Sequence, residues 1–173
     1  MLARPVGYVT WNLESTDGKP HAVQLYFDAA AEIVVNDPRQ EVVWAREDIG
    51  DLVAVKVRSK DQPILQKKGD DLRIDWGCLY VAAERTSAEL VVASFQTCRE
   101  TFVSGGSLSE AMDRRMPRAA SDDTPVAACA FDLGKTSEHR TRYLMLAYDD
   151  EFSVKYFHRS EEHTSELQSR QSI

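Results

Sequence analysis

The chain has 173 residues, of which 28% are charged, and its formal net charge is −7 at pH 7. This length suits a single domain that can bury a sizeable core. The acidic balance argues against a nucleic-acid partner, which would need clustered lysines and arginines. The longest basic runs are the isolated doublets Lys67-Lys68 and Arg114-Arg115, which are typical of solvated turn and helix charges. No apolar run approaches the ~20 residues that span a bilayer, and no signal peptide is visible in the sequence.

Apolar and polar side chains alternate with a period of two in three early segments. The apolar positions are Val9, Trp11 and Leu13, then Val23, Leu25 and Phe27, then Val53, Val55 and Val57. Successive side chains of a strand point to opposite faces of the sheet, so this alternation places one apolar face against a core. Each segment is therefore predicted to be a half-buried antiparallel strand.

An acidic glycine turn leads into a fourth alternating segment between Lys67 and Tyr80. The alternating side chains are Leu72, Ile74 and Trp76 on one side and Arg73 and Asp75 on the other. The same argument predicts a strand whose buried face carries the two aliphatic residues and the tryptophan.

Three later segments are more continuously apolar, as central strands covered on both faces would be. They run from Ala88 to Phe95, from Val126 to Leu133 and from Tyr143 to Tyr148. Between the first two, Ser107 and Glu110 have the spacing of a capping box, which predicts a short helix near residues 107–116 that ends before Pro117. The whole pattern predicts an all-β fold, an antiparallel β-sandwich with one helical excursion.

Motifs of known catalytic chemistry are missing from the sequence. No serine has a lysine three positions later, and neither the His-Glu-x-x-His nor the Gly-x-Ser-x-Gly pattern occurs. Cys78, Cys98 and Cys129 lack zinc-ligand spacing and stand in apolar contexts, so we expect them to be buried as small hydrophobic side chains. A disulfide between two of them would need neighbouring strands, which the sequence does not establish. No cofactor site and no metal site is predicted.

Carboxylates near the turn are the one group of side chains that could take part in catalysis or bind a metal ion. Hydrolases often use two carboxylates to activate water, which leaves catalysis or calcium binding open for Asp70, Asp71 and Asp75. The structural interpretation is that the first two bond turn amides while Asp75 pairs with Arg73 or a neighbouring strand. A contact between domains is a third possibility. The candidate interdomain or structural motif comprises Asp70, Asp71, Arg73, Asp75 and Trp76.

Four stretches together resemble one family, glutaminase A, over nearly everything from Arg4 to His158. The first begins at Ser15, and the others include Lys67 to Tyr80, Met116 to Ala119 and Ala130 to Lys135. The resemblance is to the N-terminal β-domain, which in the family precedes a helical-hairpin domain expected to be catalytic. It implies a secreted or periplasmic enzyme that converts L-glutamine to L-glutamate and ammonia. The partner it implies is that C-terminal helical domain.

The last fifteen residues resemble something else. Residues 159–169 match, codon for codon, the start of a widely used short-read sequencing adapter, and residues 170–173 fit its continuation. We therefore expect residues 1–158 to be a glutaminase A-like sandwich domain, incomplete at both ends, and residues 159–173 to be a non-native tail, an artefact in a metagenomic fragment.

Two functions of different classes follow. The first is an accessory β-domain of a glutaminase A-like amidohydrolase, inactive when separated from the helical domain. The second is a carbohydrate-binding or packing module of a glycoside-hydrolase-like enzyme, because a fold does not fix a substrate.

Overall fold

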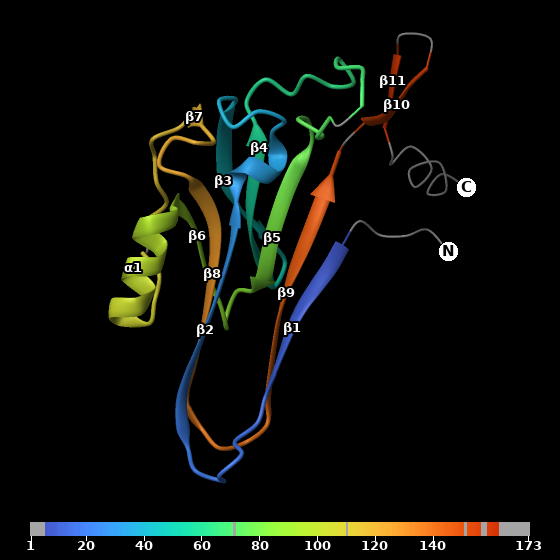
Figure 1. Cartoon of the computed structure of the whole chain (residues 1–173). Coiled ribbons are helices and arrows are strands. Elements are labelled where there is room, and N and C mark those ends of the chain that lie inside the picture. The colour runs from blue at the N-terminus through green and yellow to red at the C-terminus, as the bar shows by residue number, and fades with distance from the viewer. Residues whose placement is uncertain (1–5, 71, 110, 151, 157–158, 163–173) are drawn as a thin grey trace, which may run out of the picture.

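A computed structural model describes residues 6–70, 72–109, 111–150, 152–156 and 159–162 (Figure 1). In these ranges the chain forms two antiparallel sheets packed face to face, a separate two-stranded sheet and a single α-helix. The predicted all-β sandwich with one helical excursion is confirmed.

The two sheets differ in size. The larger has six strands in the order β1–β9–β5–β4–β3–β7, and the smaller has three in the order β2–β8–β6. The bounds of the larger sheet's strands are β1 Val6–Leu13, β9 Arg140–Asp149, β5 Cys78–Glu84, β4 Leu52–Ser59, β3 Glu41–Ile49 and β7 Arg118–Ala119. Those of the smaller are β2 His21–Ala30, β8 Pro125–Thr136 and β6 Glu89–Ser94, and a 3-10 helix, η1 (Ala31–Val34), follows β2.

The main core lies between the facing sheets. In β4 the predicted apolar positions Val53, Val55 and Val57 are all fully buried, and Val55 stands opposite Val81 of β5. Complete burial of a valine side chain contributes about 1.5–3 kcal/mol. The alternation seen in the sequence is therefore the pattern that fixes which face of the large sheet is inside.

Strand β8 is buried on both faces, as its continuous apolar run predicts. Its inward residues Ala127, Cys129 and Phe131 belong to the core between the sheets. Its outward residues Val126, Ala128 and Ala130 belong to a second cluster together with Cys98 of the helix. Figure 1 shows the helix α1 (Phe95–Gly105) against this outer side of the small sheet.

The position predicted for the helix was wrong. The helix begins after Ser94, whose side chain accepts a hydrogen bond from the backbone N–H of Thr97, and it ends at Gly106, which adopts a left-handed φ of 71°. Ser107 thus follows the helix instead of starting one. The next segment is held by tertiary contacts: the N–H of Leu108 donates to Glu89 Oε2 at 2.7 Å. Glu110 lies outside the described residues.

The strand predicted around Leu72 was also wrong. Residues 72–77 form no strand, and β5 starts at Cys78. Leu72 and Ile74 are 42% and 43% exposed, whereas Asp75 is 1% exposed. Arg73 is exposed as well, so burial does not alternate along this segment: the aliphatic residues lie outside and the carboxylate is buried.

A separate two-stranded sheet pairs β10 (Phe152–Tyr156) with β11 (Arg159–Glu162). Strand β11 lies in the part of the chain that the sequence sets apart as a tail. Residues 163–173 of that tail lie outside the described residues.

Candidate functional site

The connection between β4 and β5 is the most unusual part of the fold. These strands are antiparallel neighbours, with Arg58 opposite Cys78, and a hairpin of 2–5 residues would usually join them. Here the chain instead runs through residues 60–77 without a helix or strand at any described position. Loops of this length inside a compact domain are commonly functional. This loop also carries all five residues of the predicted motif.

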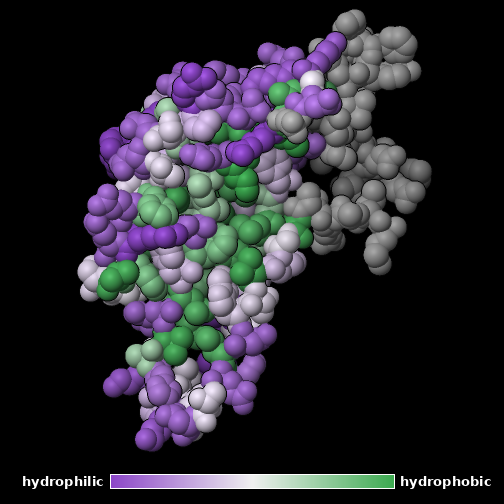
Figure 2. Space-filling view, viewed as in Figure 1, coloured by the Kyte–Doolittle hydropathy of each residue, from purple (hydrophilic) through white to green (hydrophobic). Residues whose placement is uncertain are grey.

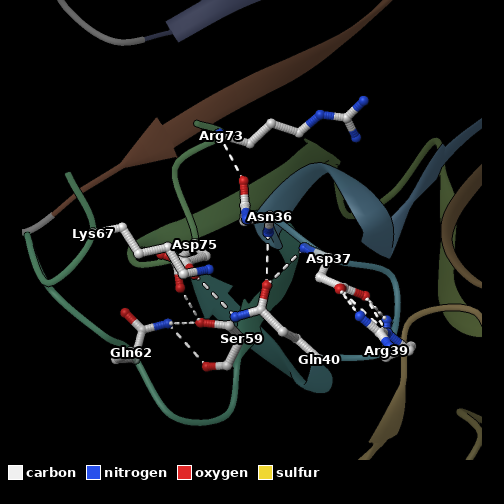
Figure 3. A network of polar contacts seen from close by, with 9 residues as sticks. All are labelled: Asn36, Asp37, Arg39, Gln40, Ser59, Gln62, Lys67, Arg73 and Asp75. Atoms are coloured by element: carbon white, nitrogen blue, oxygen red, sulfur yellow. Dashed lines mark hydrogen bonds and ion pairs between the residues drawn. The ribbon is translucent and has the colours of Figure 1, made fainter. Parts of the chain in front are cut away.

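Asp75 is the centre of the loop's polar network (Figure 3). Its side chain is 1% exposed, and its Oδ2 atom accepts hydrogen bonds from Lys67 Nζ at 2.6 Å and from Gln40 Nε2 at 3.0 Å. A buried carboxylate is costly unless it is paired and hydrogen-bonded, so these two donors stabilise it. Its other oxygen, Oδ1, is buried and has no hydrogen-bond partner.

The backbone around Asp75 is fixed by the end of β4. Ser59 Oγ donates to the carbonyl oxygen of Asp75 at 2.5 Å. Gln62 spans the base of the loop, because its Nε2 donates to the carbonyl of Ser59 at 2.9 Å and its Oε1 accepts from the N–H of Gly77 at 2.7 Å. The two ends of the loop are therefore tied to each other.

Gly77 and Trp76 attach the same segment to β9. Gly77 has a φ of +85°, and a Cβ atom there would lie 2.5 Å from the carbonyl oxygen of Asp149. The hydroxyl of Tyr148 donates to the carbonyl of Trp76 at 2.6 Å. Burial raises the pKa of Tyr148 to about 12, so this hydroxyl stays a donor at neutral pH.

Gln40 connects the loop to the segment after η1. Its Oε1 accepts from the backbone N–H groups of Asn36 and Asp37, both at 2.8 Å, while its Nε2 donates to Asp75. The side chain of Asn36 then accepts from the N–H of Arg73 at 3.0 Å. One carboxamide thus uses both of its ends to join two loops that are far apart in sequence.

The structure separates the members of the predicted motif. Asp75 and Trp76 take part in the network, the latter through its backbone carbonyl. Asp70 and Arg73 are exposed, and Figure 3 shows the Arg73 side chain pointing away from Asp75. Asp71 lies outside the described residues. Two pairings were open for Asp75, with Arg73 or with a neighbouring strand. The cation that Asp75 contacts is Lys67, and its second donor, Gln40, directly precedes β3.

Sequence reasoning missed Lys67, Gln40, Ser59 and Gln62. Lys67 belongs to one of the isolated basic doublets, yet its side chain, which is 38% exposed, holds a buried carboxylate. No local pattern marks the two glutamines. The available signal was an aspartate at an alternating position inside an apolar sequence, since a carboxylate that points inward requires donors nearby.

A second charged network lies beneath β3. Arg118 is 6% exposed, donates from Nη1 to Asp113 Oδ2 at 2.7 Å and lies 5.4 Å from the centre of the Trp44 ring. Arg115 also binds Asp113, and these arginines hold the pKa of that carboxyl well below its usual range. The Trp44 Nε1 atom donates to the carbonyl of Asp113 at 2.8 Å. This network holds the segment after α1 against the large sheet.

The contacts around Asp75 form a structural network and not an acid–base pair. We call this network the clamp and define it by Gln40, Ser59, Gln62, Lys67 and Asp75. Asp75 is out of solvent and neutralised by Lys67, so it is poorly placed to exchange a proton with a substrate. Within the described residues no group of three histidine, cysteine or acidic side chains could hold a metal ion. Nor does any helix among them have the length and apolar character needed to cross a membrane. The three cysteines are buried, as expected.

Three exposed apolar side chains belong to the segments that the clamp joins or stand directly next to them. Ile33 of η1, Leu72 and Ile74 are 56%, 42% and 43% exposed. The hydrogen bond from Arg73 to Asn36 brings the last two alongside the segment that follows η1. A rigid loop with outward aliphatic residues is suited to contact another surface.

Comparisons with known proteins agree with the resemblance found in the sequence. The chain is 31% identical over 150 residues to a protein of Aspergillus oryzae named glutaminase A, and the aligned part covers 82% of this chain. It covers 21% of the relative, so the chain spans about a fifth of that protein's length. A family model described as a domain of unknown function, DUF5127, matches residues 1–169. The chain belongs to the DUF5127 family.

Proposed function

We propose that this chain is an accessory β-sandwich domain of a larger glutaminase A-like amidohydrolase. The observation that carries the proposal is the use of the acidic motif: Asp75 is enclosed in an ion pair with Lys67 that fixes a loop, which leaves Asp70 as the one other carboxylate among the motif's described residues. The catalytic groups for converting L-glutamine to L-glutamate and ammonia would then lie elsewhere in the larger polypeptide.

The partner in this proposal is a helical-hairpin domain of the same polypeptide. The loop between β4 and β5 would contact it, because the clamp makes the loop rigid while Ile33, Leu72 and Ile74 remain outside. A rigid surface loses little conformational entropy on docking. Export of the whole protein from the cell is part of the same proposal and is supported by the resemblance to glutaminase A.

An activity assay tests the proposal. The purified chain is incubated with L-glutamine and ammonia is measured by a coupled dehydrogenase assay, with the complete gene product assayed in parallel. We expect ammonia from the complete product and none above buffer from the chain. Ammonia-releasing activity that co-elutes with the purified chain would contradict the proposal. A complete product that hydrolyses a glycan and leaves glutamine intact would instead favour the module of a glycoside-hydrolase-like enzyme.

A further inference from the structure

The two sheets of the sandwich have different numbers of strands. Six strands face three, so the small sheet covers only part of the inner face of the large one. Strand β2 (His21–Ala30) pairs with β8 along one edge, and no other strand of the described ranges pairs with its second edge. A long edge strand with unpaired N–H and C=O groups is a template for another strand.

Burial falls towards that free edge in the small sheet. Phe131 and Cys129 of β8 are 1% and 0% exposed. Their register partners on β2, Leu25 and Phe27, point to the same core but are only half-buried. The inward apolar side chains of the edge strand β2 are therefore less buried than their partners on β8.

The same gradient occurs in the large sheet. The inward valines of β4 are fully buried, and Leu144 of β9 is as well. Leu146 and Tyr148 of β9 and Val9 and Trp11 of β1 are half-buried. The sandwich is therefore open where β1 and β2 form its edges.

Figure 2 shows apolar surface gathered along this opening, on the side where Figure 1 places β2 opposite β9 and β1. We call the strip the β1–β2 seam and define it by the half-buried inward residues Val9, Trp11, Leu25, Phe27, Leu146 and Tyr148. The ring of Trp11 lies 5.8 Å from that of Phe131, so the seam is continuous with the core between the sheets.

We propose that the seam binds one additional β-strand, which extends the small sheet at β2. An extended segment can pair with the free backbone edge while every second side chain packs between the sheets. A helix satisfies its own backbone and would leave the β2 edge unpaired, so it fits the seam less well. The strand would come from the larger polypeptide, a source that rests on the proposed function, since the relative is about five times longer than its aligned part.

Hydrogen exchange tests this proposal independently of activity. Amide exchange in residues 21–30 is compared by mass spectrometry between the 173-residue chain and the complete gene product. We expect at least tenfold slower exchange in the complete product, because a bound strand protects the outward amides of β2. Equal exchange rates in the two proteins would overturn the proposal, whether or not the complete product hydrolyses glutamine.

Matched substitutions distinguish strand binding from general stabilisation. Leu25→Arg places a charge in the seam, whereas Gln24→Arg places it on an exposed neighbouring residue. In the complete product we expect Leu25→Arg to abolish the extra protection of β2 and Gln24→Arg to retain it. The isolated chain should elute as a monomer in light scattering. A dimer that Leu25→Arg dissociates would show that a second copy fills the seam, which contradicts the proposed source.

Discussion

At the scale of single residues, the inward position of Asp75 decides the local structure. Among the described residues its carboxylate has two donors, so losing either one leaves a buried charge poorly satisfied. Trp76, next to it, is half-buried and contributes its backbone carbonyl to the network. Trp76 and Leu72 do not share a buried face as the alternation predicts, because Leu72 is exposed while Trp76 is half-buried.

Lys67→Met should therefore destabilise the fold. Removing a charged donor from a buried carboxylate costs about 1–3 kcal/mol, and we expect the lower half of that range because the Lys67 side chain is 38% exposed. The free energy of unfolding is measured in urea. Lys68→Met is the matched control, since Lys68 is exposed, and it should change stability by less than ~0.5 kcal/mol. Equal effects of the two substitutions would show that the ion pair contributes nothing.

Residue patterns explain both the successes and the failures of prediction. The alternation in Val53, Val55 and Val57 places β4 correctly, because burial of one sheet face requires a period of two. The same period around Leu72 is misleading, because the segment is a loop held by side-chain hydrogen bonds in which Leu72, Arg73 and Ile74 are all exposed. Its partners, such as Gln40, come from distant parts of the chain, and no local pattern predicts such contacts.

At the scale of elements, the loop between β4 and β5 is held by geometry as well as by charge. Gln62 has a φ of 47°, a left-handed conformation that is unfavourable for a side chain with a Cβ atom. Its carboxamide bonds to Ser59 and Gly77 offset that cost.

The helix α1 shows the opposite case, because local chemistry is enough to fix its ends: Ser94 caps its start and Gly106 ends it. The capping-box spacing at Ser107 starts no helix, and the chain there is held by a hydrogen bond to Glu89 instead.

Gly77→Ala should be far more harmful than Gly18→Ala. Both glycines have positive φ, +85° and +69°, so both substitutions carry a backbone cost of about 1–2 kcal/mol. Only at Gly77 would the new methyl group also meet backbone, 2.5 Å from the carbonyl oxygen of Asp149, while Gly18 has open space around it. Urea unfolding of the two variants isolates the steric contribution. Similar losses of stability would mean that β9 can move away from the loop at little cost.

At the scale of the whole molecule, the sequence predicts the architecture better than the site. The sandwich follows from the strand pattern, because several short alternating strands can bury their apolar faces only by stacking sheets. Sheet order and the unequal number of strands depend on pairing between distant segments, which alternation does not specify. The open seam beside β2 arises from that inequality, so it could not be predicted from any single strand.

The tail gives the last prediction. Deleting residues 159–173 should leave the thermal midpoint of the sandwich unchanged within error. The reason is that β11 pairs with β10 in a sheet of its own, separate from both sheets of the sandwich in the described ranges. The deleted segment is also almost entirely polar, with Leu167 and Ile173 as its aliphatic residues, and so offers little apolar surface to offset an ordering entropy of about 1–2 kcal/mol per residue.

Calorimetry of the truncated and complete chains measures the effect, and Val55→Ala serves as a control for sensitivity. That substitution removes two methyl groups from a fully buried side chain and should lower the midpoint by several degrees. A comparable drop on truncation would show that the tail supports the sandwich, in keeping with a family match that runs to residue 169. An unchanged midpoint is the result expected of a foreign segment, because a sequence unrelated to the fold has no reason to complement its surface.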